Sequence, residues 1–171
     1  MSEIQNQKSL VSILADNKKG MLSKLTTFFA SNDMNIESLT LSSADIENKI
    51  HRTTAYITGD RNRIDGLCKD MGKIEGVHKV INFMSNSFIE RELGLIKIKV
   101  TNPSMPQITN LVNEQNGEII FVNSEIMICQ IEETEEKVDS FMSRAKEITN
   151  DIEILRTGIV AISLDADINN I

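Results

Sequence analysis

The sequence predicts an α+β protein made of two tandem ferredoxin-like domains, each with the element order βαββαβ. Segments with helical periodicity and segments with strand-like alternation follow one another in this order. The order then starts a second time, with Leu95 in the place of Leu10. Hydrophobic residues make up 40% of the 171 residues, which is enough to build two small cores. We therefore expect one domain over residues 1–86 and a second over residues 87–171.

The first repeat opens with an apolar run that is expected to form a buried strand. A helix should follow, because Leu22, Leu25 and Phe29 recur at helical spacing, and Ile64 and Met71 indicate a second helix in the same way. A polar stretch between the two middle strands suits a hairpin loop. In order, the expected elements are a strand over 9–15, a helix over 20–32, strands over 34–42 and 50–58, a helix over 61–74 and a strand over 76–85.

The second repeat shows the same patterns. Ile96 and Ile98 alternate with Lys97 and Lys99, as in a strand with one buried face. Pro103 lies near the start of the next helix, where a missing N–H does no harm. The expected elements are a strand over 92–101, a helix over 104–116, strands over 118–123 and 125–132, a helix over 133–148 and a strand over 151–164.

Several function classes are disfavoured by the bulk properties. The net charge of −7 leaves no basic footprint for nucleic acid, and no apolar run has the length of a membrane span. The first residues lack the apolar core of a signal peptide, so we expect a cytoplasmic protein. Two cysteines form no metal or disulfide pattern. His51 and His78 are expected to be exposed strand residues, and no catalytic constellation or metal site is found.

The turn between the first strand and the first helix is the best candidate for a ligand site. Gly20 lies at the expected helix start, where unpaired N–H groups and the helix dipole favour a carboxylate. Asn17 precedes the helix, and Asn35 opens the next strand with both a carbonyl and an amide to offer. Together these groups could hold an α-amino acid. The bland alternative is an ordinary N-cap and a tight turn. The second repeat has no equivalent of Gly20, so any such site belongs to the first.

Four stretches resemble the small, or regulatory, subunit of acetolactate synthase. The first two, Asn17 to Ser23 and Asn35 to Leu39, look like parts of the N-terminal ACT domain of that family. The other two run from Ile89 to Lys97 and from Arg156 to Ala161. They follow the family order over nearly the whole chain, which makes the resemblance far more specific than any one of them alone.

The resemblance implies an ACT domain over residues 1–86 that binds valine, and a C-terminal domain particular to the small subunits. The ACT domains of the family pair side by side, so the resemblance also implies a homodimer in which Asn35 of one chain lies near Gly20 of the other. The valine-binding residues that it implies are Asn17, Lys19, Gly20, Met21, Leu22, Asn35 and Ile36.

The family function implied is regulation without catalysis. The partner would be the catalytic large subunit, which condenses pyruvate in branched-chain amino acid biosynthesis. Thiamine diphosphate, Mg²⁺ and FAD would be bound by that subunit and none of them by this chain. The chain would raise the activity of the holoenzyme and make it sensitive to valine. The alternative is a free-standing ACT amino-acid sensor that regulates another protein. Phe121, where the family tends to carry Asp, is a departure that bears on the strength of activation.

Overall fold

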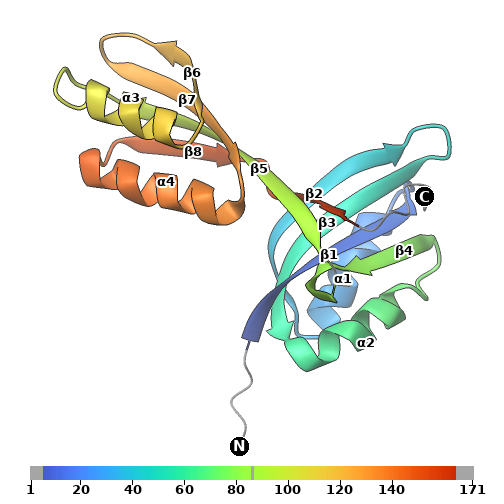
Figure 1. Cartoon of the computed structure of the whole chain (residues 1–171). Coiled ribbons are helices and arrows are strands. Elements are labelled where there is room, and N and C mark those ends of the chain that lie inside the picture. Colours follow the sequence, from blue (N-terminus) through green and yellow to red (C-terminus); the bar gives the residue numbers. More distant parts are fainter. Residues whose placement is uncertain (1–5, 86, 165–171) are drawn as a thin grey trace, which may run out of the picture. The chain divides into compact units, whose positions relative to one another are not determined.

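The computed structural model describes residues 6–85 and 87–164 (Figure 1). These residues form two compact units. Unit 1 contains the described residues up to Ile89 together with those from Val160 onward, and unit 2 contains Glu90–Ile159. The chain therefore passes from unit 1 into unit 2 and back again.

This division differs from the expected one at both ends of the second domain. Unit 2 begins at Glu90 instead of residue 87, and the segment from Val160 belongs to unit 1. Strand pairing is the physical reason. Strand β9 (Val160–Ser163) pairs with β5 (Phe88–Lys99), and the Leu164 N–H donates to the Ser87 carbonyl at 2.9 Å.

Unit 1 has the predicted βαββαβ order. Its sheet is antiparallel, with the strand order β2-β3-β1-β4, so β2 and β4 are the edge strands. The elements are β1 (Asn6–Asp16), α1 (Met21–Ser31), β2 (Asn35–Asp45), β3 (Ile50–Asp60), α2 (Arg61–Met71) and β4 (Val77–Asn82), followed by the short 3-10 helix η1 (Phe83–Ser85).

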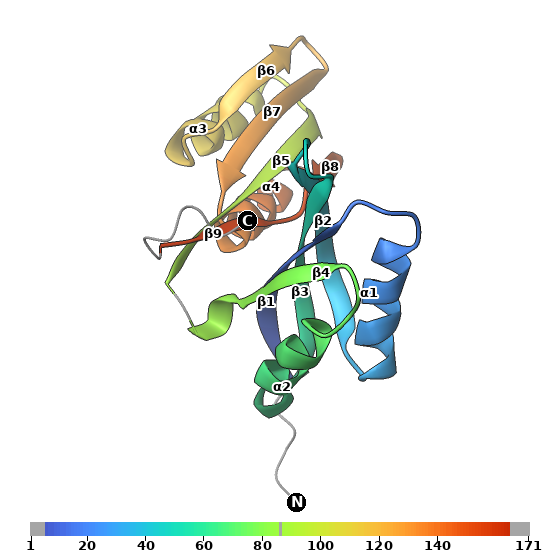
Figure 2. The same ribbon diagram turned by 90° about the vertical axis from the view of Figure 1, so that its right-hand side faces the viewer.

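Helices α1 and α2 lie on the same side of the unit 1 sheet (Figures 1 and 2). Their apolar stripes pack against alternate residues of the central strand β1, as the sequence periodicities predict. The buried cluster between sheet and helices includes Val11, Ile13, Leu25, Phe29, Ile64 and Met71. This core holds the two ends of α1 at fixed places over the sheet.

Unit 2 repeats this architecture. Its strand order is β6-β7-β5-β8, in which each strand occupies the place of its counterpart in unit 1. The further elements are α3 (Met105–Glu114), β6 (Glu118–Val122), β7 (Ile126–Glu133), α4 (Glu135–Ile148) and β8 (Ile152–Arg156). The core consists of Ile96, Ile98, Ile108, Val112, Val138 and Phe141, with further apolar neighbours. Two ferredoxin-like units, as predicted, make up the chain.

Some element bounds differ from the predicted ones. The single strand expected over 151–164 is two strands, β8 and β9, because Gly158 between them has a φ of 77° that no strand accommodates. The strand expected from residue 92 already begins at Phe88, where it pairs with β9. Helix α3 begins at Met105, with Pro106 in its first turn, so Pro103 lies in the preceding turn.

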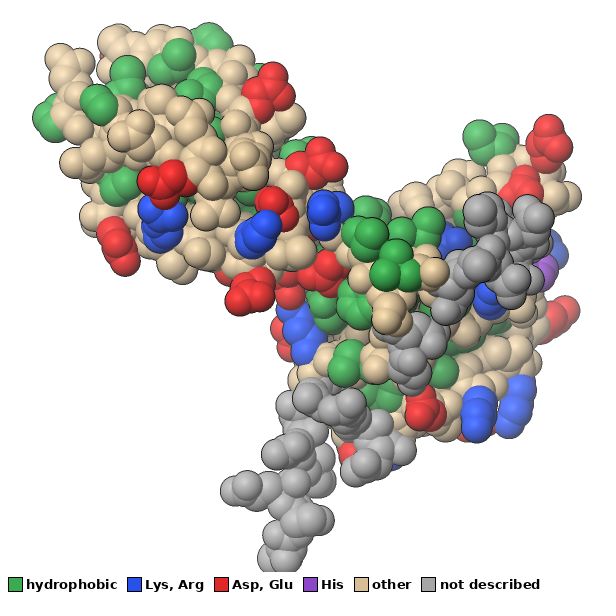
Figure 3. Space-filling model, in the orientation of Figure 1, with side chains coloured by type: hydrophobic (Ala, Val, Ile, Leu, Met, Phe, Trp, Pro, Cys, Tyr) green, Lys and Arg blue, Asp and Glu red, His purple; other side chains and the backbone are tan. Residues whose placement is uncertain are grey.

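Acidic and basic side chains are interspersed over the face shown in Figure 3, without a continuous basic patch in that view. No helix in the described part of the chain is both long enough and apolar enough to cross a membrane.

Candidate ligand-binding site at the start of α1

The turn between β1 and α1 has the backbone geometry of a helix-end site. Gly20 is the N-cap of α1 and has a φ of 85°, a conformation that strains any residue with a side chain. No side chain caps the helix, and the first turn carries no acidic residue. The start of α1 therefore lacks the groups with which proteins usually neutralise the positive end of a helix.

Two backbone donors at this helix end remain open. The Met21 N–H donates to the Lys18 carbonyl at 3.2 Å, and the ladder of α1 begins with the Lys24 N–H and the Gly20 carbonyl at 2.9 Å. The N–H groups of Leu22 and Ser23 have no hydrogen-bond partner among residues 6–85 and 87–164. Leu22 can thus offer a donor to a carboxylate, whereas Met21 contributes a buried side chain to the core.

Charged side chains surround the same turn. The Asp16 carboxylate lies 2.6 Å from Lys18 Nζ and 2.7 Å from His78 Nε2, and these partners, Lys18 first, lower its pKa. A small pocket of about 160 Å³ adjoins them. It is lined by Asp16, Lys18, Lys19, Met21, Lys24, Glu75 and Gly76. Lys19 and Lys24 add positive charge where the helix end already favours an anion.

Asn17 joins this turn to the hairpin between β2 and β3. Its backbone N–H donates to the Lys49 carbonyl at 2.6 Å, while its side chain is exposed and available to a ligand. The hairpin therefore holds the turn by its main chain and leaves the amide of Asn17 unused.

Asn35 and Ile36 lie at the opposite end of the sheet from this turn. In the register, Asn35 pairs with Thr58 of β3, which in turn pairs with Lys8 of β1. Lys8 precedes Asp16 by about eight residues, a separation of roughly 26 Å along a strand. The idea that one chain brings Asn35 and Gly20 together is therefore wrong, because β2 starts where α1 ends. The site can contain both residues only if two chains contribute.

The helix of unit 2 that corresponds to α1 is α3, and it starts differently. At the start of α3 the N–H groups of Ser104 and Met105 both donate to the Thr101 carbonyl, at 3.0 and 2.9 Å. Pro106 in the first turn has no N–H at all. The N-cap of α3, Ser104, has a right-handed conformation, so this helix start lacks the left-handed glycine found at the start of α1.

The expectation for His51 was wrong. Its side chain is only 5% exposed, because β3 is an inner strand with α1 and α2 over one face. Burial lowers its pKa, against the opposing influence of the Asp16 charge. His51 Nε2 and the hydroxyl of Thr53 are buried, and neither has a hydrogen-bond partner among the residues that the structure describes. Sequence alone gives no signal for this, since strand order decides which strands are covered on both faces.

The third and fourth stretches that resemble the family contact each other in unit 2. Arg156 Nε donates to Glu92 Oε1 at 3.0 Å, and Arg156 Nη1 donates to Asp139 at 2.6 Å. Thr157 exchanges backbone and side-chain hydrogen bonds with Leu93. The nearly buried carboxylate of Glu92 raises the pKa of Arg156, and Asp139 adds to this. We call this network of Glu92, Asp139 and Arg156 the clasp, since it ties β5, β8 and α4 together.

Comparisons with known proteins agree with the two units. The family model described as the AHAS small subunit-like ACT domain matches residues 11–79, and the one described as the small subunit of acetolactate synthase matches residues 91–165. The acetolactate synthase small subunit of Haemophilus influenzae is 33% identical, over 91% of this chain and 95% of that protein.

Two further relatives extend the comparison. The acetolactate synthase isozyme 3 small subunit of Escherichia coli is 27% identical over 91% of this chain and 95% of its own length. The crystal structure of the acetolactate synthase small subunit from Thermotoga maritima superposes with a TM-score of 0.79 and 32% identity. It covers 92% of this chain and 97% of that one.

Proposed function

The chain belongs to the family of acetolactate synthase small subunits, and on that premise we propose that it activates the catalytic large subunit and confers inhibition by valine. The single observation that carries the proposal is the uncapped start of α1. This helix start has Gly20 in a left-handed conformation, two open N–H donors and several lysines nearby. It occurs in a chain that matches the family over almost its whole length.

In this proposal the chain performs no chemistry itself. The large subunit would bind thiamine diphosphate, Mg²⁺ and FAD, and would condense pyruvate with a second oxoacid. This chain would contribute binding energy alone, by preferring one state of the assembly when valine is bound. None of its residues is proposed to hold a cofactor.

The proposed valine site has two halves. The carboxylate would accept hydrogen bonds from the N–H groups of Leu22 and Ser23, which gives about 0.3–1 kcal/mol at an exposed helix end. The side chains of Asn17 and Lys19, from the turn before α1, would contact the amino acid, and Asn35 with Ile36 of a second chain would complete the site. Burial of the isopropyl group would add about 1.5–3 kcal/mol. Leucine and isoleucine should then bind more weakly but still measurably, since one methylene is worth about 1–3 kcal/mol.

A homodimer through unit 1 follows from the same proposal. Strand β2 is an edge of its sheet and offers unpaired backbone groups to another strand. Antiparallel pairing of two β2 strands would bring Asn35 of one chain level with Asp45 of the other. Asp45 pairs with Ile50, which pairs with Asp16 just before the α1 turn. A two-fold pair would therefore hold two equivalent sites, each built from both chains.

Reconstitution with the catalytic large subunit tests the proposal. We expect addition of this chain to raise acetolactate production and valine to lower it again, with valine binding measured by calorimetry. The variant Gly20→Asp should lose binding, because it strains the turn and places a second carboxylate beside that of valine. Lys73→Asp, on the loop after α2, is the control for a general charge effect. Full valine binding by Gly20→Asp would refute this site.

A further inference from the structure

The outer face of the unit 1 sheet, turned away from α1 and α2, carries two basic side chains on one row. In the register, Arg52 on β3 pairs with Leu14 on β1, and Leu14 pairs with Lys79 on β4. Register partners share a face of the sheet, and Val11 and Ile13 on the other face pack under the helices. Arg52 and Lys79 are both half-buried, and they lie on either side of a fully buried leucine.

The guanidinium of Arg52 has no opposite charge beside it. Its Nη1 donates to Ser12 Oγ at 3.4 Å, a long hydrogen bond to an uncharged group, and no carboxylate in the described part of the chain forms an ion pair with it. Burial alone lowers its pKa, and Ser12 and Thr54 on the next row are only 1% and 3% exposed. A partly buried charge without a counter-charge destabilises a fold, so its presence indicates a group that binds there.

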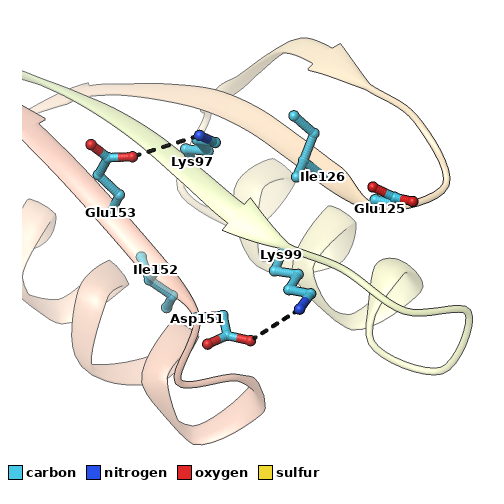
Figure 4. A pocket seen from close by; sticks show the side chains of 7 residues that line it. All are labelled: Lys97, Lys99, Glu125, Ile126, Asp151, Ile152 and Glu153. Atoms are coloured by element: carbon cyan, nitrogen blue, oxygen red, sulfur yellow. Dashed lines mark ion pairs between the residues drawn. The ribbon is translucent and has the colours of Figure 1, made fainter.

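The corresponding face of unit 2 neutralises its cations with acids on the neighbouring strand. Lys97 Nζ on β5 lies 3.8 Å from Glu153 on β8, and Lys99 Nζ lies 3.9 Å from Asp151 (Figure 4). In unit 1 the strand equivalent to β8 is β4, and it presents Lys79 in the place of Asp151. The chain has 25 acidic residues against 18 basic ones, so the unpaired cations of unit 1 do not reflect a shortage of acids.

Arg52 and Lys79 can reach one ligand together. Two strand spacings separate their backbones, or about 10 Å, and both side chains are long enough to lean over Leu14 from either side. The planar fork of an arginine matches the oxygens of a carboxylate or phosphate group, and a lysine adds a point charge. Ser12, which contacts the guanidinium, and Ser42, its register partner on β2, offer hydroxyl donors. The row therefore combines the groups that bind an oxyanion.

We propose that Arg52 and Lys79 bind a small oxyanion, the carboxylate or phosphate group of a metabolite, on the outer face of unit 1. Asp16, two residues further along β1 than the row, does not neutralise this site, because its carboxylate is already paired with Lys18 and His78. The proposal does not depend on the proposed function, since valine would bind at the start of α1, and α1 covers the opposite face of the sheet.

The experiment is a titration of the isotope-labelled full chain with inorganic phosphate, followed by nuclear magnetic resonance at constant low ionic strength. We expect the Nε–H signal of Arg52 to shift until it saturates, while the signal of the exposed Arg63 on α2 stays in place. A parallel titration with acetate distinguishes the two sources, because the anion that saturates at the lower concentration identifies the group. The variant Gly20→Asp should show the same shift of Arg52, which separates this site from the helix end. No saturable shift with either anion would overturn the proposal.

Matched variants separate the two cations from the general charge of the chain. Lys79→Gln should weaken the binding of the anion about tenfold or more, the usual effect of removing one charged hydrogen bond. Lys69→Gln removes an exposed lysine on α2 and should keep the wild-type affinity. Equal losses in both variants would show a general charge effect and contradict the site.

Thermal unfolding gives a second measurement, which a purely structural role of Arg52 would not produce. Phosphate should raise the unfolding midpoint of the wild type and leave that of Arg52→Gln unchanged, because a ligand stabilises only the state that binds it. Without phosphate, Arg52→Gln should unfold at the wild-type midpoint or above it, since no ion pair is lost. A variant that is less stable without phosphate, and gains as much from phosphate as the wild type, would overturn the proposal.

Discussion

Gly20 and Leu22 act in the proposed site through the main chain, so their side chains matter only by what they permit. Gly20 permits the left-handed turn, and the half-buried Leu22 holds the first turn of α1 in place while its N–H stays open. Residue types at a strand-to-helix turn were enough to predict a helix start at Gly20. They could not predict the hydrogen bond from the Met21 N–H to the Lys18 carbonyl, because this bond depends on the backbone path of the turn.

His51 provides a prediction at the same scale. Its folded pKa is lowered by burial, so below its unfolded value of about 6.5 the unfolded chain binds the proton more readily. The contribution of His51 to the free energy of unfolding is therefore complete above that pH, and it is lost as the pH falls below it. We expect the urea midpoint of the wild type to drop between about pH 7.5 and pH 5.5, and to drop less in His51→Gln.

The control for this effect is His78→Gln, which removes the exposed histidine beside Asp16. It should retain the part of the pH dependence that arises from His51. If His51→Gln and wild type lose stability in parallel over this range, burial of His51 is not the cause.

At the scale of elements, the clasp explains why two of the family-like stretches are found together in this chain. They are 64 residues apart in sequence and adjacent in space, where β5 and β8 pair and α4 packs over them. In the sequence they serve only as marks of the small-subunit family. The structure shows them joined by hydrogen bonds and by the ion pair between Arg156 and Glu92, which gives them a structural role in unit 2.

Removal of Arg156 from the clasp should be costly. Arg156→Gln leaves the Glu92 carboxylate, which is 4% exposed, without its cation. We expect a loss of about 3 kcal/mol, the lower end for a broken buried pair, because Arg156 itself is partly exposed. Urea unfolding followed by circular dichroism measures it. Arg144→Gln, which removes an exposed pair with Glu114, is the matched control and should cost less than about 1 kcal/mol. Similar losses in both variants would contradict this account.

At the scale of the whole molecule, the two units have the same fold and different surfaces. Unit 1 has the open helix end and the edge strand β2, whereas unit 2 has the clasp and an outer face on which Lys97 and Lys99 pair with acids. Duplication of the fold therefore does not imply duplication of the site. In the proposed function, valine binding belongs to unit 1 and activation of the large subunit to unit 2, so we expect the two roles to be separable.

The variant Asn35→Ala tests this separation. It removes a side chain that would reach valine only across a unit 1 dimer, and we expect about tenfold weaker inhibition, or roughly 1.4 kcal/mol of lost coupling. Stimulation of the catalytic subunit at saturation should persist, because unit 2 is unchanged. Acetolactate production with and without valine measures both effects. Loss of activation together with inhibition, in a folded dimer, would show that the two roles cannot be separated.

The sequence by itself determined the element order, the duplication, the helix start at Gly20 and the family. These depend on local periodicity and on short stretches whose meaning does not change with context. Tertiary structure alone decided that Asn35 and Gly20 lie at opposite ends of one sheet, that His51 is buried and that Arg156 reaches Glu92. It also decided that the described residues after Ile159 belong to unit 1. All four depend on strand register and strand order, which are set by hydrogen bonds between segments far apart in the chain.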